Sequence, residues 1–130
     1  MKVIIAGSRS IKVNATTLDT LSQLIDQIMV AFDAASMPGL FNITEVVSGG
    51  AAGGDQLGEA YAKQHNLPVK LFPADWRRHG LGAGPHRNRQ MRDYADALIA
   101  LWDGRSPGTH HMIRIAREKG MPVFVKTMEV

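Results

Sequence analysis

The sequence predicts one α/β domain, built on a five-stranded parallel sheet with helices on both faces and strand order 3-2-1-4-5. Five short apolar runs alternate with four helical patterns along the 130 residues, and this alternation is typical of such a sheet. The strand order follows from right-handed crossovers and from a single point at which the chain returns to the first strand and adds the later strands on its other side. The length suits a single domain over residues 1–130 and is too short for two ordinary ones.

The first strand is expected at Lys2–Ala6, an apolar β-branched run that stops at Gly7–Arg9. The helix after it is expected to begin at a capping box formed by Thr16 and Asp19 and to end before Pro38-Gly39. Its apolar residues recur at helical spacing and predict a stripe that faces the core. The stripe consists of Leu18, Leu21, Ile25, Ile28, Met29 and Phe32.

A glycine-rich turn joins the second strand, around Val46 and Val47, to a helix that runs to about His65. Glycines permit positive φ and the close approach of a ligand to the main chain, and the helix start behind them suits a phosphate. A turn that is merely tight is the alternative. The motif is not a P-loop, because Asp55 follows its last glycine, and it is not a dinucleotide fingerprint, because it does not follow the first strand. The glycines are Gly49, Gly50, Gly53 and Gly54.

The third strand is expected at Val69–Phe72, and the connection after it, Pro73–Gly84, is long and rich in glycine. Loops of this length in a compact domain are often functional. Trp76 in this connection would either stack on a base or cover exposed core. Pro85 suits the first turn of the next helix. The face of that helix includes Arg87, Asn88, Met91 and Tyr94.

The fourth strand, Ala97–Leu101, is continuous and apolar, which indicates burial on both faces. The loop Asp103–Thr109 follows, and the last helix is expected to open with Gly108-Thr109 and to end at Gly120. Met121–Lys126 then completes the sheet as its fifth strand.

The predicted topology brings three loops to one place. In a parallel sheet of this order the strand C-termini share one edge, and ligands bind where the order reverses, between strands one and four. Gly7–Arg9 and Asp103–Thr109 belong to that position, and the loop Gly49–Asp55 lies beside them. We therefore expect the three loops to converge on one ligand.

Three side chains near this edge have both a structural and a functional interpretation. Thr109 would be an N-cap, contributing about 1 kcal/mol, or a donor to a phosphate, and the two roles are compatible. Asp55 would cap its helix or, alternatively, bind a ribose hydroxyl or orient water. Arg87 would be an ordinary surface arginine, or its planar guanidinium would contact an anion.

Six arginines fall within one stretch of the chain, although the net charge of +3 is mild. They would form a solvated face, ring an anionic ligand or contact nucleic acid. Nothing in the chain resembles a recognition helix or an RNA-binding signature, so nucleic acid is the least favoured of the three. The arginines are Arg77, Arg78, Arg87, Arg89, Arg92 and Arg105.

Composition and residue spacing also exclude several kinds of site and segment. The absence of cysteine excludes disulfides and thiolate metal sites. The histidines form no i, i+4 pair or HExxH pattern, so neither a metal nor a cofactor is expected. No apolar run has the length of a signal peptide or a membrane span, and we expect a cytoplasmic protein without a membrane partner. The histidines considered are His79, His86, His110 and His111.

Several separated segments, in order, closely resemble the YspA/YpsA-related branch of the SLOG superfamily: VVSGGAAGGDQLGEAYA, FPADW, AGPHRNRQM, and ADALIALWDG followed by GT. That superfamily also includes the LOG phosphoribohydrolases and the DNA-processing protein DprA. The resemblance covers the chain from Gly7 to Val123 and implies a three-layer, Rossmann-like domain. It also implies that a nucleotide or phosphorylated nucleotide derivative binds at the C-terminal edge of the sheet, with the protein acting as sensor or carrier, and that the chain forms a homodimer.

The resemblance and the loop pattern together give a set of candidate ligand-binding residues. Gly7 and Ser8 match the family's first loop, Arg87 and Asn88 match its arginine motif, and Gly108-Thr109 matches its phosphate-binding helix start. The full set is Gly7, Ser8, Arg9, Ser48, Gly49, Gly50, Gly53, Asp55, Arg87, Asn88, Asp103, Gly108 and Thr109.

Two departures from the family pattern leave the activity open. Met112 stands where the LOG enzymes carry a glutamate, and Ala52 stands where relatives place an arginine. A hydrolase of a nucleotide N-glycosidic or phosphate bond is the first alternative, with Asp55 or Asp103 activating water, and no catalytic residue is assigned. A DNA-processing accessory protein that uses the arginines is the second.

Overall fold

The computed structural model describes residues 1–35 and 41–129. Pro38 and Gly39, the expected stop of the first long helix, lie outside the described residues. That helix ends earlier, at Ala34.

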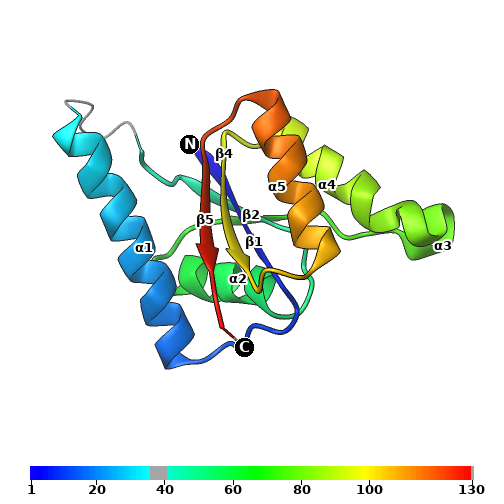
Figure 1. Ribbon diagram of the computed structural model, residues 1–130, viewed down its shortest axis with the longest axis horizontal. Helices are drawn as coiled ribbons and strands as arrows, with labels where there is room; N and C mark the ends of the chain where they lie inside the picture. The colour runs from blue at the N-terminus through cyan, green and yellow to red at the C-terminus, as the bar shows by residue number, and fades with distance from the viewer. Residues whose placement is uncertain (36–40, 130) are drawn as a thin grey trace.

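The sheet has the predicted topology. Five strands, all parallel, lie in the order β3-β2-β1-β4-β5, and β1 lies at the centre, where Val3 is paired with Val46 on one side and Ala97 on the other. The strand order reverses between β1 and β4: β2 and β3 lie on one side of β1, and β4 and β5 lie on the other (Figure 1). The strands are β1 Lys2–Gly7, β2 Glu45–Ser48, β3 Val69–Leu71, β4 Ala97–Trp102 and β5 Val123–Thr127.

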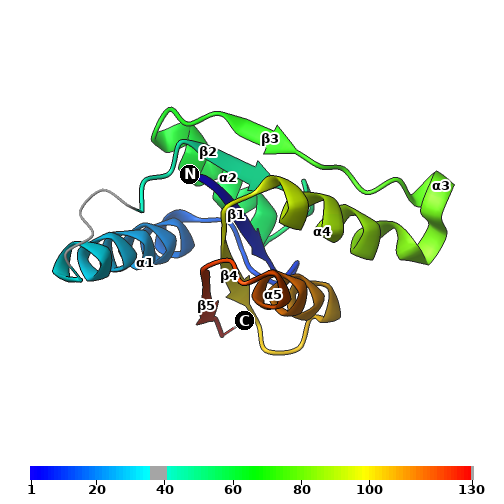
Figure 2. The same cartoon turned by 90° about the horizontal axis from the view of Figure 1, so that it is seen from above.

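Helices cover both faces of the sheet, with α1 and α2 on one side and α4 and α5 on the other (Figures 1 and 2). Within residues 1–35 and 41–129 no helix combines the length and the apolarity needed to cross a membrane. The helices are α1 Ala15–Ala34, α2 Gly54–Gln64, α3 Trp76–His79, the 3-10 turn η1 Gly80–Gly82, α4 Ala83–Tyr94 and α5 Pro107–Lys119.

The continuous apolar runs are explained by burial on both faces. In β1, Val3 and Ile5 pack with α1 and α2, whereas Ile4 and Ala6 pack with α4 and α5. Successive side chains of a strand point to opposite faces, so alternate residues of the run pack into the cores on opposite sides of the sheet. The three-layer α/β architecture follows from this division.

Two predicted helix starts differ from the structure. The first helix begins at Ala15 and is capped by Asn14, whose Oδ1 accepts from Thr17 N at 2.9 Å while Thr17 Oγ1 accepts from Asn14 N at 3.0 Å. The box therefore lies two residues earlier than predicted, because asparagine supplies a cap as well as threonine does. The last helix begins at Pro107, with Ser106 as N-cap, so Thr109 is not a cap. Helix α4 begins at Ala83, so Pro85 lies in its first turn, as predicted.

The connection after β3, predicted as one long loop, is partly helical. It contains α3 and η1, and the Asp75 side chain starts α3 by accepting from Arg78 N at 3.1 Å. These short turns project at the periphery of the molecule (Figures 1 and 2), and Trp76 on α3 is 52% exposed. The apolar stripe of α1 is also imperfect, since Met29 is exposed.

Two glycines allow α2 to lie directly on β1. A methyl group at Gly54 would lie 2.2 Å from the Cα of Gly7, and one at Gly58 would lie 2.6 Å from the Cβ of Ile5. Real side chains do not approach this closely, so both positions require glycine. The start of α2 is thereby held against the end of β1.

Gly58→Ala is expected to destabilise the protein by about 1 kcal/mol, because overpacking against Ile5 costs about 1–3 kcal/mol and the gain in helix propensity offsets only about 1 kcal/mol of it. Thermal denaturation should show a melting temperature lower by about 4 °C. Gly82→Ala is the control, because a methyl group there meets no atom within 4 Å. Equal stability of Gly58→Ala and the wild type would contradict the close packing.

Candidate functional site

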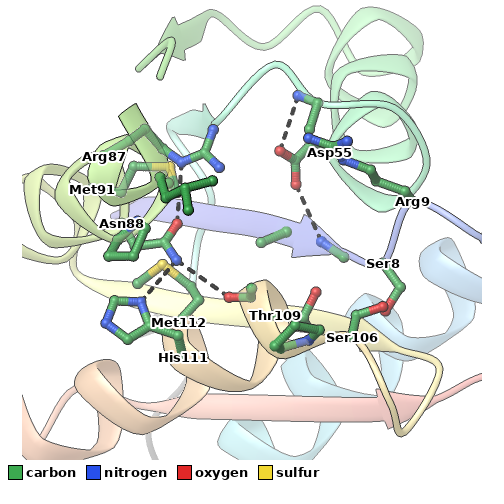
Figure 3. A pocket seen from close by; sticks show the side chains of 18 of the residues that line it. Ser8, Arg9, Asp55, Arg87, Asn88, Met91, Ser106, Thr109, His111 and Met112 are labelled. Atoms are coloured by element: carbon green, nitrogen blue, oxygen red, sulfur yellow. Dashed lines mark hydrogen bonds between the residues drawn. The ribbon is translucent and has the colours of Figure 1, made fainter. Parts of the chain in front are cut away.

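A cavity of about 580 Å³ opens at the C-terminal edge of the sheet (Figure 3). Pockets for small molecules in proteins commonly measure about 300–1,000 Å³. The loop after β1, the start of α2 and the start of α5 meet there, together with α4 and the α3–η1 segment. Eight of the predicted residues line it: Gly7, Ser8, Arg9, Asp55, Arg87, Asn88, Gly108 and Thr109.

A second hollow of about 370 Å³ adjoins the first and contains Gly49 and Gly50. The two hollows share part of their walls, since Arg9, Ala51, Trp76 and Arg87 line both. Three of the predicted residues line neither hollow, and these are Ser48, Gly53 and Asp103.

The first turn of α5 presents hydrogen-bond donors to the larger cavity. Gly108 and Thr109 lie among its first three residues, whose N–H groups have no partner within a helix. Thr109 as a whole residue is only 7% exposed, and its hydroxyl makes no hydrogen bond to any described residue. No fully buried side-chain oxygen in the described part of the chain lacks a partner, so the Thr109 hydroxyl is open to the cavity that its residue lines.

Asn88 connects Arg87 to the start of α5 (Figure 3). Arg87 Nε donates to Asn88 Oδ1 at 3.1 Å, and Asn88 Nδ2 donates to Gly108 O at 3.3 Å and meets His111 Nδ1 at 3.1 Å. Because arginine only donates, the amide oxygen must face Arg87 and the amide nitrogen must face His111. His111 Nδ1 is therefore the acceptor, and the ring carries its proton on Nε2.

Burial lowers the pKa of His111, and Arg114, Arg89 and Arg92 lower it further, while Glu118 opposes them. A lowered pKa favours the neutral ring. Neutral His111 is the form that accepts from Asn88, so the electrostatics and the hydrogen bond are consistent.

Arg87 is held between the two hollows. Its Nη1 donates to Gly49 O at 2.8 Å, and a methyl group at Gly49 would lie 2.3 Å from that nitrogen. Burial lowers the pKa of Arg87, the Asp55 carboxylate raises it, and the charge of Arg9 lowers it again. An arginine side chain stays charged in proteins, so Arg87 and Arg9 together present more positive charge than Asp55 balances.

Asp55 fastens the glycine turn to the end of β1 and is not a helix cap. Its Oδ1 accepts from Gly7 N at 3.2 Å and its Oδ2 from Ala51 N at 3.1 Å. The N-cap of α2 is Gly53, which makes no side-chain bond. Asp55 is 5% exposed, and burial raises its pKa, although the two N–H groups and Arg87 oppose the rise.

The glycine turn serves the protein itself more than a ligand. Gly53, at φ +80°, and Gly54 pack against the loop after β1, and Gly54 N donates to Ser8 O at 3.1 Å. Gly50 N donates to Ser48 Oγ at 3.1 Å, and the next amide is bound to Asp55. The predicted close approach of a ligand is therefore left to Gly50, where a methyl group would meet no atom nearer than 3.9 Å.

Three predicted polar residues organise the loops around the cavity. Ser48 is fully buried and donates to Glu59 Oε2 at 2.9 Å. The Ser8 hydroxyl accepts from Asp103 N at 3.0 Å. The Asp103 carboxylate accepts from Ser10 Oγ, from Arg105 N, and from both the N–H and the hydroxyl of Ser106, each at 2.8 Å, and these bonds hold its pKa well below its usual range.

Sequence reasoning missed several residues that line the cavity, among them Leu81, Ser106 and His111. Leu81 lies within the long connection Pro73–Gly84, where no pattern singled it out, and no pattern pairs His111 with Asn88 across 23 residues. The other histidines have aromatic neighbours. The rings of His79 and His86 lie 4.2 Å apart, and His110 stacks on Trp102 at 5.6 Å. Residues 1–35 and 41–129 contain no cluster of three side chains suited to a metal ion.

Comparison with known proteins supplies a family. The family described as "YspA, cpYpsA-related SLOG family" matches residues 1–79. The Gene 61 protein of Mycobacterium phage D29 is 37% identical to this chain over 129 residues, which covers 95% of this chain and 94% of the phage protein. No solved structure matches the chain.

The raised pKa of Asp55 predicts a pH dependence of stability. The folded state holds the carboxyl proton more tightly than the unfolded chain, whose ordinary value is 3.8. The stability from this group is therefore present below pH 3.8 and is lost as the pH rises through the folded value. Each tenfold difference in proton affinity contributes about 1.4 kcal/mol.

Urea denaturation between pH 4 and pH 7 should show this loss as a comparison between the wild type and Asp55→Asn. The variant keeps the size of the side chain and cannot titrate, so the free energy of unfolding of the wild type should fall relative to that of Asp55→Asn as the pH rises. If the free energy of unfolding of the wild type stayed constant or rose relative to that of Asp55→Asn as the pH rises, the assigned direction of the Asp55 pKa shift would be contradicted.

Proposed function

The chain belongs to the YspA, cpYpsA-related SLOG family, and from this membership and the geometry of the cavity we propose that it binds a phosphorylated nucleotide derivative, as a sensor or carrier. The ligand occupies the cavity at the C-terminal edge of the sheet. Its phosphate lies at the start of α5.

The Thr109 hydroxyl carries this proposal. This hydroxyl has no hydrogen-bond partner among the described residues and opens to the cavity beside the free N–H groups of a helix start, so it can donate to a ligand. Such a start favours an anion through its donors and its dipole. A phosphate oxygen at this position would satisfy the hydroxyl and the amides together.

The charges around the cavity support an anionic ligand. Arg9 and Arg87 both line it, and Asp55 is the carboxylate beside them. Arg87 is fixed by Gly49 O and Asn88, so little side-chain entropy is lost when it meets a phosphate. Charge-assisted hydrogen bonds from a preorganised guanidinium are among the stronger ones in proteins.

The apolar part of the cavity supports a base as the remaining part of the ligand. Trp76 and Leu81 lie on the α3–η1 side, and Met91 and Met112 lie on α4 and α5. A planar ring can stack on an exposed tryptophan, which contributes about 1–3 kcal/mol per base in nucleic-acid complexes. A nucleotide satisfies the anionic and the apolar ends of one cavity.

Hydrolysis of a nucleotide is the alternative, and one observation favours it. Asp55 is a buried carboxyl with a raised pKa that lines the cavity, and such groups often act as acids or bases. Both of its oxygens already accept backbone hydrogen bonds, and Met112 offers no second acid or base. Binding without turnover therefore agrees better with the side chains present.

The proposal is tested by mass spectrometry of small molecules released from the purified protein, followed by thermal-shift measurements with nucleotides. A ligand at 100 times its dissociation constant stabilises the protein by about 2.7 kcal/mol, which raises the melting temperature by several degrees. Release of free base or phosphate from added nucleotides would instead support the hydrolase. If no nucleotide raises the melting temperature, the proposed function is wrong.

Thr109→Val should weaken binding without weakening the fold. The substitution removes the hydroxyl and keeps the shape of the side chain, and the loss of one hydrogen bond to a charged group is worth about 1.5–3 kcal/mol. Calorimetry should therefore show at least a tenfold lower affinity for the nucleotide that stabilises the wild type. The melting temperature without ligand should stay the same or rise, because the hydroxyl has no partner in the protein.

Thr109→Ser is the matched control, since it retains the hydroxyl and should bind within about threefold of the wild type, a difference below 1 kcal/mol. Unchanged affinity in Thr109→Val would remove the hydroxyl from the site.

A further inference from the structure

We propose that the second hollow is a subsite of the same ligand, so that the ligand is a nucleoside diphosphate joined to a second, uncharged ring. This inference rests on the proposed function and specifies its ligand class. The base would lie in the larger hollow, the diphosphate at the wall between the two hollows, and the second ring in the smaller hollow.

The position of the arginines is the first argument. Arg9 and Arg87 line both hollows, so the positive charge lies between two spaces of about 580 and 370 Å³. A ligand that matches this arrangement carries its negative charge in the middle and a neutral group on each side.

The separation of the anion-binding groups is the second argument. The Arg87 guanidinium and the backbone of Gly108 are joined through the Asn88 amide, by contacts of 3.1 and 3.3 Å. One amide side chain therefore lies between the arginine and the start of α5. Two linked phosphates span such an interval better than one, with one phosphate at the helix start and the other at the arginines.

The lining of the smaller hollow is the third argument. Apart from the two shared arginines it contains no charged side chain, and the amides of Gly50 and Ala51 are already bound to Ser48 and Asp55. A further phosphate would find no free donor from those two amides. Leu71 and Trp76, each 52% exposed, offer apolar surface instead, which suits the face of a sugar or another ring.

The charge balance at the shared wall is the fourth argument. Arg9 and Arg87 are near enough for the charge of Arg9 to lower the pKa of Arg87. Asp55 offsets one of these two positive charges, which leaves an excess of one. The linker phosphate that lies at the arginines would compensate this excess where the two hollows meet, and the other phosphate would lie at the positive end of the α5 dipole.

Calorimetry with three matched series tests the inference. Each series contains the nucleoside monophosphate, the nucleoside diphosphate and a nucleoside diphosphate sugar, with adenine (AMP, ADP, ADP-ribose), guanine (GMP, GDP, GDP-mannose) or uracil (UMP, UDP, UDP-glucose). Within the series whose base is accepted, we expect the affinity to rise at least tenfold from the monophosphate to the diphosphate sugar. Equal affinities within that series would overturn the second subsite.

Ala74→Phe isolates the smaller hollow, because Ala74 lines it and does not line the larger one. The larger side chain should remove the gain that the second ring provides and leave the monophosphate affinity within twofold of the wild type. Ala74→Ser, which adds little volume, should retain the gain. If Ala74→Phe weakens all three ligands of a series equally, or none of them, the second subsite is wrong.

Leu71→Ala gives an independent measurement should Ala74→Phe lower the melting temperature of the free protein. Leu71 is half exposed at the edge strand, so its truncation should spare the fold and lower only the affinity for the diphosphate sugar, by about threefold or more. No loss would count against the subsite. Failure of every compound, monophosphates included, would overturn the proposed function itself, whereas binding of monophosphates alone would overturn only this extension.

Discussion

The backbones of Gly7 and Gly54 are in contact where β1 ends and α2 begins, and the arrangement of the cavity depends on that contact. A side chain at either position would separate the two elements. Asp55, one residue further along, can then accept from Gly7 N and Ala51 N. The contact and the two hydrogen bonds fix the glycine turn relative to the central strand. Residues of this turn and of the end of β1 form part of the walls of the two hollows.

A second set of hydrogen bonds connects the opposite wall to the same glycine turn. Arg87 on α4 reaches across to Gly49 O, and Asn88, its neighbour, reaches α5 through Gly108 O. Both side chains come from one turn of one helix, so α4 links the glycine turn to the start of α5. A guanidinium that is held by two hydrogen bonds within the protein is well suited to bind an anion, because it is preorganised.

The proposed nucleotide site uses the family's loops in an unexpected way. The glycine turn mainly packs against its neighbours and binds its own amides, whereas the start of α5 keeps its donors free. In the proposed site, the helix start and the arginines therefore bind the anion. The exposed α3–η1 segment, with Trp76 and Leu81, forms the apolar side of the same cavity.

The sequence by itself determined the sheet, its order and the edge where the loops meet, because apolar runs and helical spacing report burial along the chain. It also predicted that Arg87, Asn88 and Thr109 lie at that edge, where all three line the larger hollow. Only the tertiary structure decided which polar atoms remain free. Asp55 and Thr109 both resembled helix caps, but one is bound by two amides from other segments and the other has no partner. Hydrogen bonds between segments far apart in the chain leave no periodic signal, so the sequence could not distinguish the two.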